Sequence, residues 1–275
     1  MTIQTFTIIG GNGFIGNEIA KKLSLRGHNV FIPQKEDDSL WRNNLGIIIY
    51  CAGHGDCINN PLKVLDSNTT LVARLLAEAQ FSRFMYISST RVYMGNETAF
   101  EQDDLRVLSN DNRRLFNLTK LVTEELLLRS NKDVVILRPS NVYGVALDSP
   151  LFLPAITRNA ITTGTIDMYV SPDYAKDYVS VDNVAEMTIA IALKDVIKNK
   201  IFNLAAGYNV KASEIANVLQ AETGCIVNWH PINSSIEIFP VISTLALINN
   251  SVLYKSNVLH DLSEMVSQFC LILKS

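Results

Sequence analysis

A glycine-rich turn near the start of the chain carries the clearest chemical signal in the sequence. The turn reads Gly10-Gly11-Asn12-Gly13-Phe14-Ile15-Gly16 and lies between an apolar segment, Thr5–Ile9, and a helical pattern. Glycines let a backbone turn tightly and approach a pyrophosphate, whose charge then lies on the free amides of a helix N-terminus. This context favours dinucleotide binding over a purely structural turn. The predicted contacts are Gly10, Gly13, Phe14, Ile15 and Gly16.

The residues after the second predicted strand bear on which dinucleotide is bound. An acid usually accepts the ribose 2′-hydroxyl of NAD at this place, but the chain reads Ile32-Pro33-Gln34-Lys35. Lys35 could meet the 2′-phosphate of NADP, whereas one of the acids at 36–38 could reach back for NAD; a solvated turn explains these charges equally well. We expect NADP or NAD, lean to NADP, and place Gln34 and Lys35 beside the cofactor.

Alternating strand and helix patterns predict the scaffold that positions this turn. Apolar runs such as Ile47-Ile48-Ile49 are typical of strands buried on both faces, which occur in parallel sheets. The alternation predicts an α/β fold, a Rossmann-type doubly wound parallel sheet with a small C-terminal substrate lobe. The predicted segments are Thr5–Ile9, Asn17–Arg26, Val30–Ile32, Gly46–Tyr50, Leu62–Gln80, Arg83–Ser88, Leu115–Ser130 and Val134–Arg138.

The composition of the sequence changes after Tyr143-Gly144, which predicts a domain boundary. Residues 1–145 are expected to form the NAD(P)-binding Rossmann domain, with its sheet completed by later segments, about 175–205. Proline-punctuated segments and helices near Val181–Leu193 and Ala212–Thr223 follow, so residues 146–275 are expected to form mainly the substrate-binding lobe. The polar stretch Gln34–Asn44 is too short for a full strand-helix-strand excursion, so one peripheral element is expected to be missing or trimmed.

Composition excludes several classes of partner. The chain has 275 residues and a net charge of -3, which leaves no basic excess for nucleic acid. Its apolar runs are of strand length, far short of the roughly 20 residues that span a bilayer. The start of the chain lacks the pattern of a signal peptide, which predicts a cytoplasmic protein. Four scattered cysteines and four scattered histidines show no metal-ligand spacing, so no metal is expected.

Further motifs resemble the NAD-dependent epimerase/dehydratase family of extended short-chain dehydrogenases, which includes UDP-galactose 4-epimerase. The resemblance runs nearly end to end, and its motifs are highly specific when taken together. They are Gly10–Gly16, Tyr50-Cys51-Ala52-Gly53, Asn68, Ile87-Ser88-Ser89, Val92-Tyr93, Lys120, Arg138-Pro139-Ser140-Asn141-Val142-Tyr143-Gly144 and Lys176-Asp177-Tyr178-Val179-Ser180-Val181-Asp182-Asn183-Val184-Ala185.

The resemblance implies roles for particular residues. Ser89 would be the catalytic hydroxyl, and Lys120 would bind the cofactor ribose. Lys176 stands where the family usually has arginine, so a bidentate grip on diphosphate would become a point charge. The other implied cofactor contacts are Cys51, Ala52, Gly53, Asn68, Ser88, Pro139, Ser140 and Val142, and the implied substrate contacts are Ser89, Thr90, Asn141 and Lys176.

Phe116 occupies the position where the family has its catalytic tyrosine. The family reaction needs a phenol, with its pKa lowered by a lysine four residues later, to take a proton from a sugar hydroxyl as hydride leaves for the nicotinamide. Here the helix has Lys120 but phenylalanine at 116. Losing general acid-base catalysis typically removes about 10²–10⁴ in rate, while binding could survive. Tyr93 and Tyr143 are the nearest phenols by family position, and packing is the favoured role for each.

Three explanations of Phe116 stay open: an engineered Tyr→Phe substitution that traps bound substrate, a natural enzyme with another acid-base group, and a non-catalytic NAD(P)-binding sensor or assembly protein. The Thr90-Arg91 pair replaces the Asp-Glu pair of sugar-nucleotide 4,6-dehydratases, so epimerase or reductase chemistry at a sugar carbinol is expected instead. The expected substrate is a nucleotide sugar. Family members often dimerise through helices, and Leu121, Leu126 and Leu128 could contribute to a homodimer or simply face the sheet.

Overall fold

A six-stranded parallel sheet forms the centre of the computed structural model, which describes residues 2–35, 37–146, 149, 151–230 and 238–274. The strand order is β10-β5-β4-β3-β1-β2, and every neighbouring pair is parallel. The predicted α/β class and Rossmann-type sheet are therefore confirmed. The strands are β1 (Thr5–Ile9), β2 (Asn29–Phe31), β3 (Ile47–Tyr50), β4 (Arg83–Ile87), β5 (Val134–Pro139) and β10 (Ile201–Leu204).

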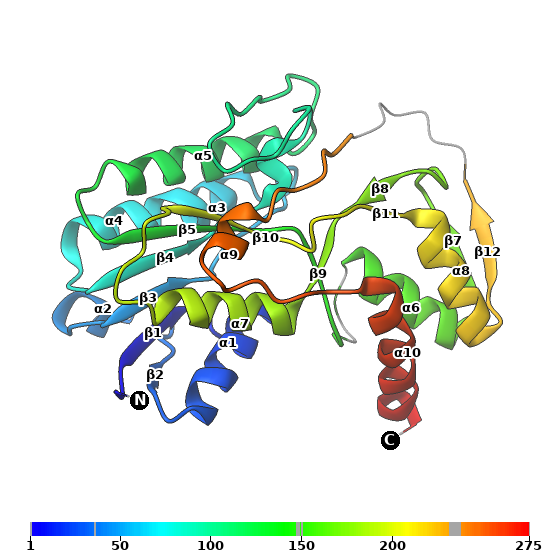
Figure 1. The fold of residues 1–275 in the computed structure, drawn as a ribbon, viewed down its shortest axis with the longest axis horizontal. Coiled ribbons are helices and arrows are strands. Elements are labelled where there is room, and N and C mark those ends of the chain that lie inside the picture. The colour runs from blue at the N-terminus through cyan, green and yellow to red at the C-terminus, as the bar shows by residue number, and fades with distance from the viewer. Residues whose placement is uncertain (1, 36, 147–148, 150, 231–237, 275) are drawn as a thin grey trace.

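Helices cover both faces of this sheet, which explains why its strands are apolar throughout (Figure 1). Residues of β1 and β3 alternate between two separate cores: Ile8 and Ile49 pack on one face, whereas Ile9 and Ile48 pack on the other. The first core includes α1 (Phe14–Leu25), α7 (Val181–Ala192) and α9 (Leu245–Asn249). The second includes α2 (Ser39–Arg42), α4 (Leu71–Glu78) and α5 (Arg114–Leu128).

The predicted helix over Leu62–Gln80 is interrupted. It begins as α3 (Pro61–Leu65), continues through a π-helical turn, η1 (Asp66–Thr70), and resumes as α4. Asn68 and Thr69 are buried within the turn, and Thr123 Oγ1 of α5 donates to the Asn68 carbonyl (2.7 Å). Single π turns often mark functional sites. The apolar spacing of this segment gives no sign of the turn, because contacts with α5 stabilise it.

The C-terminal part of the chain builds a further hydrophobic cluster beside the sheet, separate from its two cores (Figure 1). Its helices are α6 (Phe152–Thr162), α8 (Ala212–Thr223) and α10 (Val258–Lys274). Three short strand pairs accompany them: β6 (Asn141–Tyr143) with β9 (Tyr178–Ser180), β7 (Thr165–Met168) with β12 (Ile226–Trp229), and β8 (Ala175–Lys176) with β11 (Val210–Lys211).

The chain passes between the sheet and the C-terminal cluster more than once, so its path is more complex than a single boundary near residue 145. Within the range of about 175–205 that was expected to complete the sheet, β10 pairs with β5, and α7 packs in the first core. Ala246, Leu247 and Val252, from the later part of the chain, also pack in this core. The division into residues 1–145 and 146–275 stays a prediction.

The sheet ends at β2, an edge strand of three residues. Only the single-turn helix α2 separates β2 from β3 in the described residues, which agrees with the expected loss of a peripheral element. Among the residues that the structure describes, no helix is long and apolar enough to cross a membrane. A cytoplasmic location stays a prediction.

Candidate active site

A cleft of about 640 Å³ lies where the carboxyl ends of β1, β3, β4 and β5 meet the C-terminal lobe. Ligands of open α/β sheets bind at this end of the strands. The cleft brings together segments far apart in the sequence, from the glycine turn to Tyr178. The predicted residues that line it are Gly13, Phe14, Ile15, Gly16, Cys51, Gly53, Ser88, Ser89, Phe116, Lys120, Pro139, Ser140, Asn141, Val142 and Lys176.

The glycine turn is shaped for close backbone approach. A Cβ on Gly10 would lie 2.6 Å from the Ala52 amide nitrogen, and one on Gly16 would lie 2.3 Å from the Gly10 carbonyl oxygen. Gly13 is the N-cap of α1, and no side chain caps the helix. The first amides of α1 thus lack a side-chain acceptor, and they border the cleft. This arrangement fits the pyrophosphate of a dinucleotide, because a helix N-terminus attracts anions.

Lys120 brings a buried cation to the floor of the cleft. Its Nζ donates to the Ile87 carbonyl (2.9 Å) and lies 4.6 Å from the centre of the Tyr86 ring. Burial lowers the pKa of Lys120 to about 8, although the Glu124 carboxylate acts in the opposite direction. The thiol of Cys51 responds to burial in the other sense, with its pKa raised to about 12, so this thiol is neutral near pH 7. Burial therefore disfavours the charged form of both side chains.

Phe116 lies one helical turn before Lys120, with its ring centre 5.6 Å from Nζ. The two phenols nearest by family position do not replace the missing hydroxyl. Tyr93 is fully buried outside the cleft lining; its hydroxyl donates to Asn203 Oδ1 (2.9 Å) and accepts from Arg138 (2.5 Å). The Tyr143 hydroxyl donates to Asp261 Oδ2 (2.5 Å), and burial raises the pKa of this phenol. The expected packing role of both phenols is confirmed.

A buried ion pair supports the floor beneath Ser89. Arg138 NH2 lies 2.5 Å from Glu124 Oε2, and the two side chains are 3% and 4% exposed. The Ser88 hydroxyl donates to the same carboxylate. Ser88 directly follows β4, Arg138 belongs to β5, and Glu124 belongs to α5. The ion pair and its hydrogen bonds therefore connect these three elements behind the cleft. Such networks stabilise one arrangement of their elements because a lost partner leaves a buried charge.

Asp177 connects the cleft to the C-terminal lobe. Its buried carboxylate accepts hydrogen bonds from the Ser140 hydroxyl (2.5 Å) and from the backbone amides of Ala206, Gly207 and Tyr208. Burial raises the pKa of Asp177, and these hydrogen bonds act against the rise. Next to it, Lys176 Nζ lies over the Tyr174 and Phe239 rings, 4.8 and 4.6 Å from their centres. Asn141 is fixed by the residue between β8 and β9, since its side-chain amide donates to the Asp177 carbonyl (2.8 Å).

Some predicted residues lie outside the cleft lining. Gly10 and Ala52 contact each other behind the glycine turn, and Asn68 exchanges hydrogen bonds of 3.1 Å with the backbone of His54. Thr90 lines a small annex of about 80 Å³ that adjoins the cleft at Ser89. Gln34 and Lys35 are exposed at the end of β2. Among the lining residues that the sequence did not single out are Arg113, Phe152, Leu153 and Tyr174.

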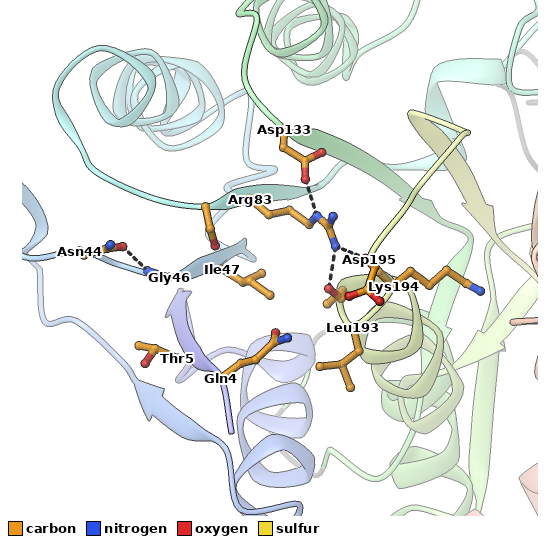
Figure 2. A pocket seen from close by; sticks show the side chains of 12 residues that line it. Gln4, Thr5, Asn44, Gly46, Ile47, Arg83, Asp133, Leu193, Lys194 and Asp195 are labelled. Atoms are coloured by element: carbon orange, nitrogen blue, oxygen red, sulfur yellow. Dashed lines mark hydrogen bonds and ion pairs between the residues drawn. The ribbon is translucent and has the colours of Figure 1, made fainter. Parts of the chain in front are cut away.

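A second hollow, of about 590 Å³, lies at the opposite, amino ends of the strands (Figure 2). Arg83 crosses it: Nε donates to Asp133 (2.8 Å), and NH1 donates to the carbonyls of Ala192 and Lys194 (2.8 and 2.7 Å). These contacts join β4 to the end of α7. We assign this hollow a structural role, because its arginine is engaged by protein groups and it lies away from the carboxyl ends of the strands.

The family model for the NAD dependent epimerase/dehydratase family matches residues 6–205. The chain belongs to this family. The match covers the sheet, the glycine turn and the cleft residues through β10. The match therefore supports an NAD-dependent epimerase or dehydratase class for this chain. It does not specify a particular reaction.

Solved structures share the fold over nearly the whole chain at low sequence identity. UDP-glucose 4-epimerase from Thermotoga maritima, solved with UDP-glucose, has a TM-score of 0.83 and 18% identity, with 98% of this chain and 99% of that chain covered. UDP-glucose 4-epimerase from Thermus thermophilus, in complex with NAD, has a TM-score of 0.77 and 19% identity over 97% and 99%. UDP-glucuronic acid 4-epimerase from Bacillus cereus, with UDP-glucuronic acid and NAD, has values of 0.81 and 15% over 98% and 99%.

Proposed function

We propose that the chain binds NAD and a nucleotide-activated sugar side by side in the cleft, with hydride transfer at a sugar carbinol as its chemistry. One observation carries the proposal. A single cleft joins the uncapped N-terminus of α1, the Ser89 and Lys120 pair, and the lobe residues Asn141 and Lys176. The dinucleotide would supply the hydride acceptor; every other function belongs to backbone and side-chain groups of the protein.

Each group in the cleft has a distinct part in this proposal. The α1 amides and the glycine turn hold the pyrophosphate, and Lys120 donates to ribose hydroxyls. Ser89 holds the reacting sugar hydroxyl from the 3₁₀ turn over Thr90–Tyr93 (η2), where its own Oγ accepts from the Arg91 amide (3.1 Å). Lys176 supplies a point charge for the sugar-linked diphosphate.

We propose NAD rather than NADP, which reverses the preference drawn from Lys35. The Thermus and Bacillus relatives are complexes with NAD. Lys35 is exposed and outside the cleft lining. Hydrogen bonding by Ser39, whose amide donates to the nearby Asp37 carboxylate (2.9 Å), lowers the pKa of this acid and keeps it charged close to the end of β2.

Phe116 favours a second candidate, a protein that binds both ligands without turnover. A phenyl ring cannot exchange a proton, and Tyr93 and Tyr143 are committed to buried hydrogen bonds. The two candidates share the same ligands and differ only in rate, so one experiment separates them.

The decisive experiment is calorimetric titration of the native chain and a Phe116→Tyr variant with NAD, NADP and UDP-glucose, followed by turnover assays on nucleotide sugars. Tight NAD binding in both, with turnover only in Phe116→Tyr, supports a disabled active site. Turnover in the native chain supports another acid-base group, and binding without turnover in either supports the sensor. Absence of dinucleotide binding in both overturns the proposal.

We also propose a homodimer through α5. Val122, Leu126 and Leu128 are 41–50% exposed, and a shallow apolar groove of about 400 Å³ follows Leu121, Val122 and Leu126. Leu121 itself is partly buried against the protein. Val122 and Leu126 are one helical turn apart and share a face of α5, and exposed apolar patches often mark sites of protein–protein contact.

A further inference from the structure

His54 lines the cleft from the loop that follows β3. Its two neighbours in the chain are glycines, and their surroundings locate the loop. A Cβ on Gly53 would lie 3.6 Å from Lys120 Nζ, and one on Gly55 would lie 3.0 Å from the Arg113 NH2 nitrogen. The loop around His54 therefore runs close to two cations of the cleft.

The Phe116 ring lies near the same two cations. Its centre is 5.6 Å from the lysine nitrogen and 4.6 Å from the guanidinium carbon. Hydrogen bonds also connect the loop to this part of α5. The Asn68 side chain, which holds the His54 backbone, donates to Thr119 Oγ1 (3.0 Å), and this hydroxyl donates to the Phe116 carbonyl (2.9 Å). The backbone of His54 is thus fixed on the side of the cleft that Phe116 occupies.

The imidazole of His54 has an unused hydrogen-bonding atom. Its Nε2 is buried and has no hydrogen-bond partner among the residues that the structure describes. Buried polar atoms nearly always have a partner, and an exception calls for an explanation such as a catalytic role. Imidazole is also the side-chain group best suited to exchanging protons near neutral pH. His54 therefore offers the proton chemistry that a phenyl ring at position 116 lacks.

We infer that His54 replaces the missing phenol as the acid-base group of the proposed reaction. The inference rests on the proposed function and deepens it. As the sugar O–H bond breaks, its proton moves to His54 Nε2. The C–H bond of the same carbon breaks with its electron pair passing to NAD, and a carbon–oxygen double bond forms. The carbinol is thereby oxidised and NAD is reduced, and His54 returns the proton in the reverse step.

The test measures the formation of NADH in a single turnover of UDP-glucose with NAD, together with calorimetric binding of both ligands. The native chain should form NADH, and His54→Gln should form it about 10²–10⁴ times more slowly with unchanged affinity for both ligands. Phe116→Tyr should restore the rate in the His54→Gln background, because it returns a phenol to the family position. His260→Gln is the matched control: the His260 side chain is 70% exposed on α10, and this variant should behave as the native chain.

A second readout does not depend on turnover. The chain has four histidines, so NMR spectra of protein with isotope-labelled histidine are simple, and the signals absent in His54→Gln belong to His54. Adding UDP-glucose to the NADH complex should shift the His54 Nε2 resonance, because a sugar hydroxyl then donates to this nitrogen. The His260 signals should stay in place.

Failure of the inference and failure of the proposed function give different results. A native chain that binds both ligands without forming NADH, a His54→Gln variant as fast as the native chain, or an unmoved His54 resonance overturns the role of His54 and leaves the binding of both ligands standing. A loss of ligand affinity in His54→Gln that accounts for the loss of rate also overturns it, since His54 would then only hold a ligand or the loop. If the native chain binds neither ligand, or NAD alone, the proposed function itself fails.

Discussion

Lys120 lines the cleft as a buried cation, and its burial carries a cost to stability. Burial lowers its pKa to about 8 from the ordinary value of 10.5, so unfolding takes up a proton between about pH 8 and 10.5. The unfolded chain then binds more protons than the folded one, and stability rises as the pH increases through this range. Below pH 8 the folded protein carries the full penalty of a buried charge.

Lys120→Met should therefore stabilise the ligand-free protein. We expect a gain of about 1–2 kcal/mol at pH 7, after allowing for the lost hydrogen bond to the Ile87 carbonyl. The gain should shrink toward pH 10, where the native lysine is losing its charge. Urea denaturation at the two pH values measures it, with the exposed Lys63→Met as control. A variant less stable than the native chain at pH 7 would contradict the argument.

For the buried Arg138–Glu124 ion pair we expect the opposite effect on stability, because removing one charge of the pair should destabilise the protein. Glu124→Gln leaves the buried guanidinium without its counter-charge and should cost about 3–5 kcal/mol. Glu125→Gln is the matched control, because Glu125 lies on the same helix and is half exposed, and it forms an ion pair with the exposed Arg129. Denaturant unfolding of both variants tests this, and equal, small effects would show that the pair contributes little.

Individual site residues could be predicted where a motif fixes their neighbours. Ser89, Lys120, Asn141 and Lys176 were predicted from such motifs, and all four line the cleft. Arg113 was missed because it precedes α5 in a segment without periodicity. Its side chain lies in the cleft lining next to Gly55, a contact across 58 residues that no local pattern reports.

Among the elements of the fold, β1 and α1 are connected by the glycine turn. A Cβ on Gly16 would meet the backbone of Gly10 and Gly11, at 2.3 and 2.9 Å, so backbone rather than a flexible side chain would have to move. Gly16→Ala should push α1 away from the turn and weaken NAD binding by about tenfold or more, as expected when a dinucleotide loop loses its close packing.

Calorimetric titration with NAD checks this expectation. Asn17→Ala is the control, since Asn17 is the next residue of α1 and is exposed. Retained NAD affinity in Gly16→Ala would mean that the turn can relax without disturbing the pyrophosphate site.

Long elements with a clear period were predicted with small errors at their ends. The helix that was predicted to begin at Asn17 begins at Phe14 instead, because the last residues of the glycine turn already supply its first backbone amides. The π-helical turn at Asp66–Thr70 was not predictable, since Thr69 and Thr123 join it to α5 across 54 residues. The strand pair of β6 and β9 was missed for the same reason: its partners are distant in sequence and only three residues long.

For the whole molecule, the apolar face of α5 predicts a subunit contact. The native chain should sediment as a dimer, and a Val122→Glu, Leu126→Glu double variant should sediment as a monomer, because buried carboxylates oppose association. Leu128→Glu is a suitable control; Leu128 is exposed on the same helix but does not line the groove. A native monomer at micromolar concentration in analytical ultracentrifugation would contradict the proposed contact.

The parallel sheet with helices on both faces could be predicted from alternating patterns and family motifs. The C-terminal lobe was harder. Helices α6 and α10 were not predicted, and α9 returns to the first core through Ala246 and Leu247. Such returns depend on which hydrophobic surface remains uncovered after the sheet has formed, which is a property of the assembled fold rather than of the segment.

The short edge strand β2 has a consequence for the lifetime of the bound coenzyme. In the described residues no further strand flanks β2, and Gln34 and Lys35 at its end face solvent. The adenosine end of a dinucleotide would therefore be covered by little protein, and we expect rapid release, measurable by stopped-flow displacement of NADH. A coenzyme that leaves so readily is shared with the surrounding pool. The redox state of the bound dinucleotide would then follow the ratio of NAD to NADH around the protein.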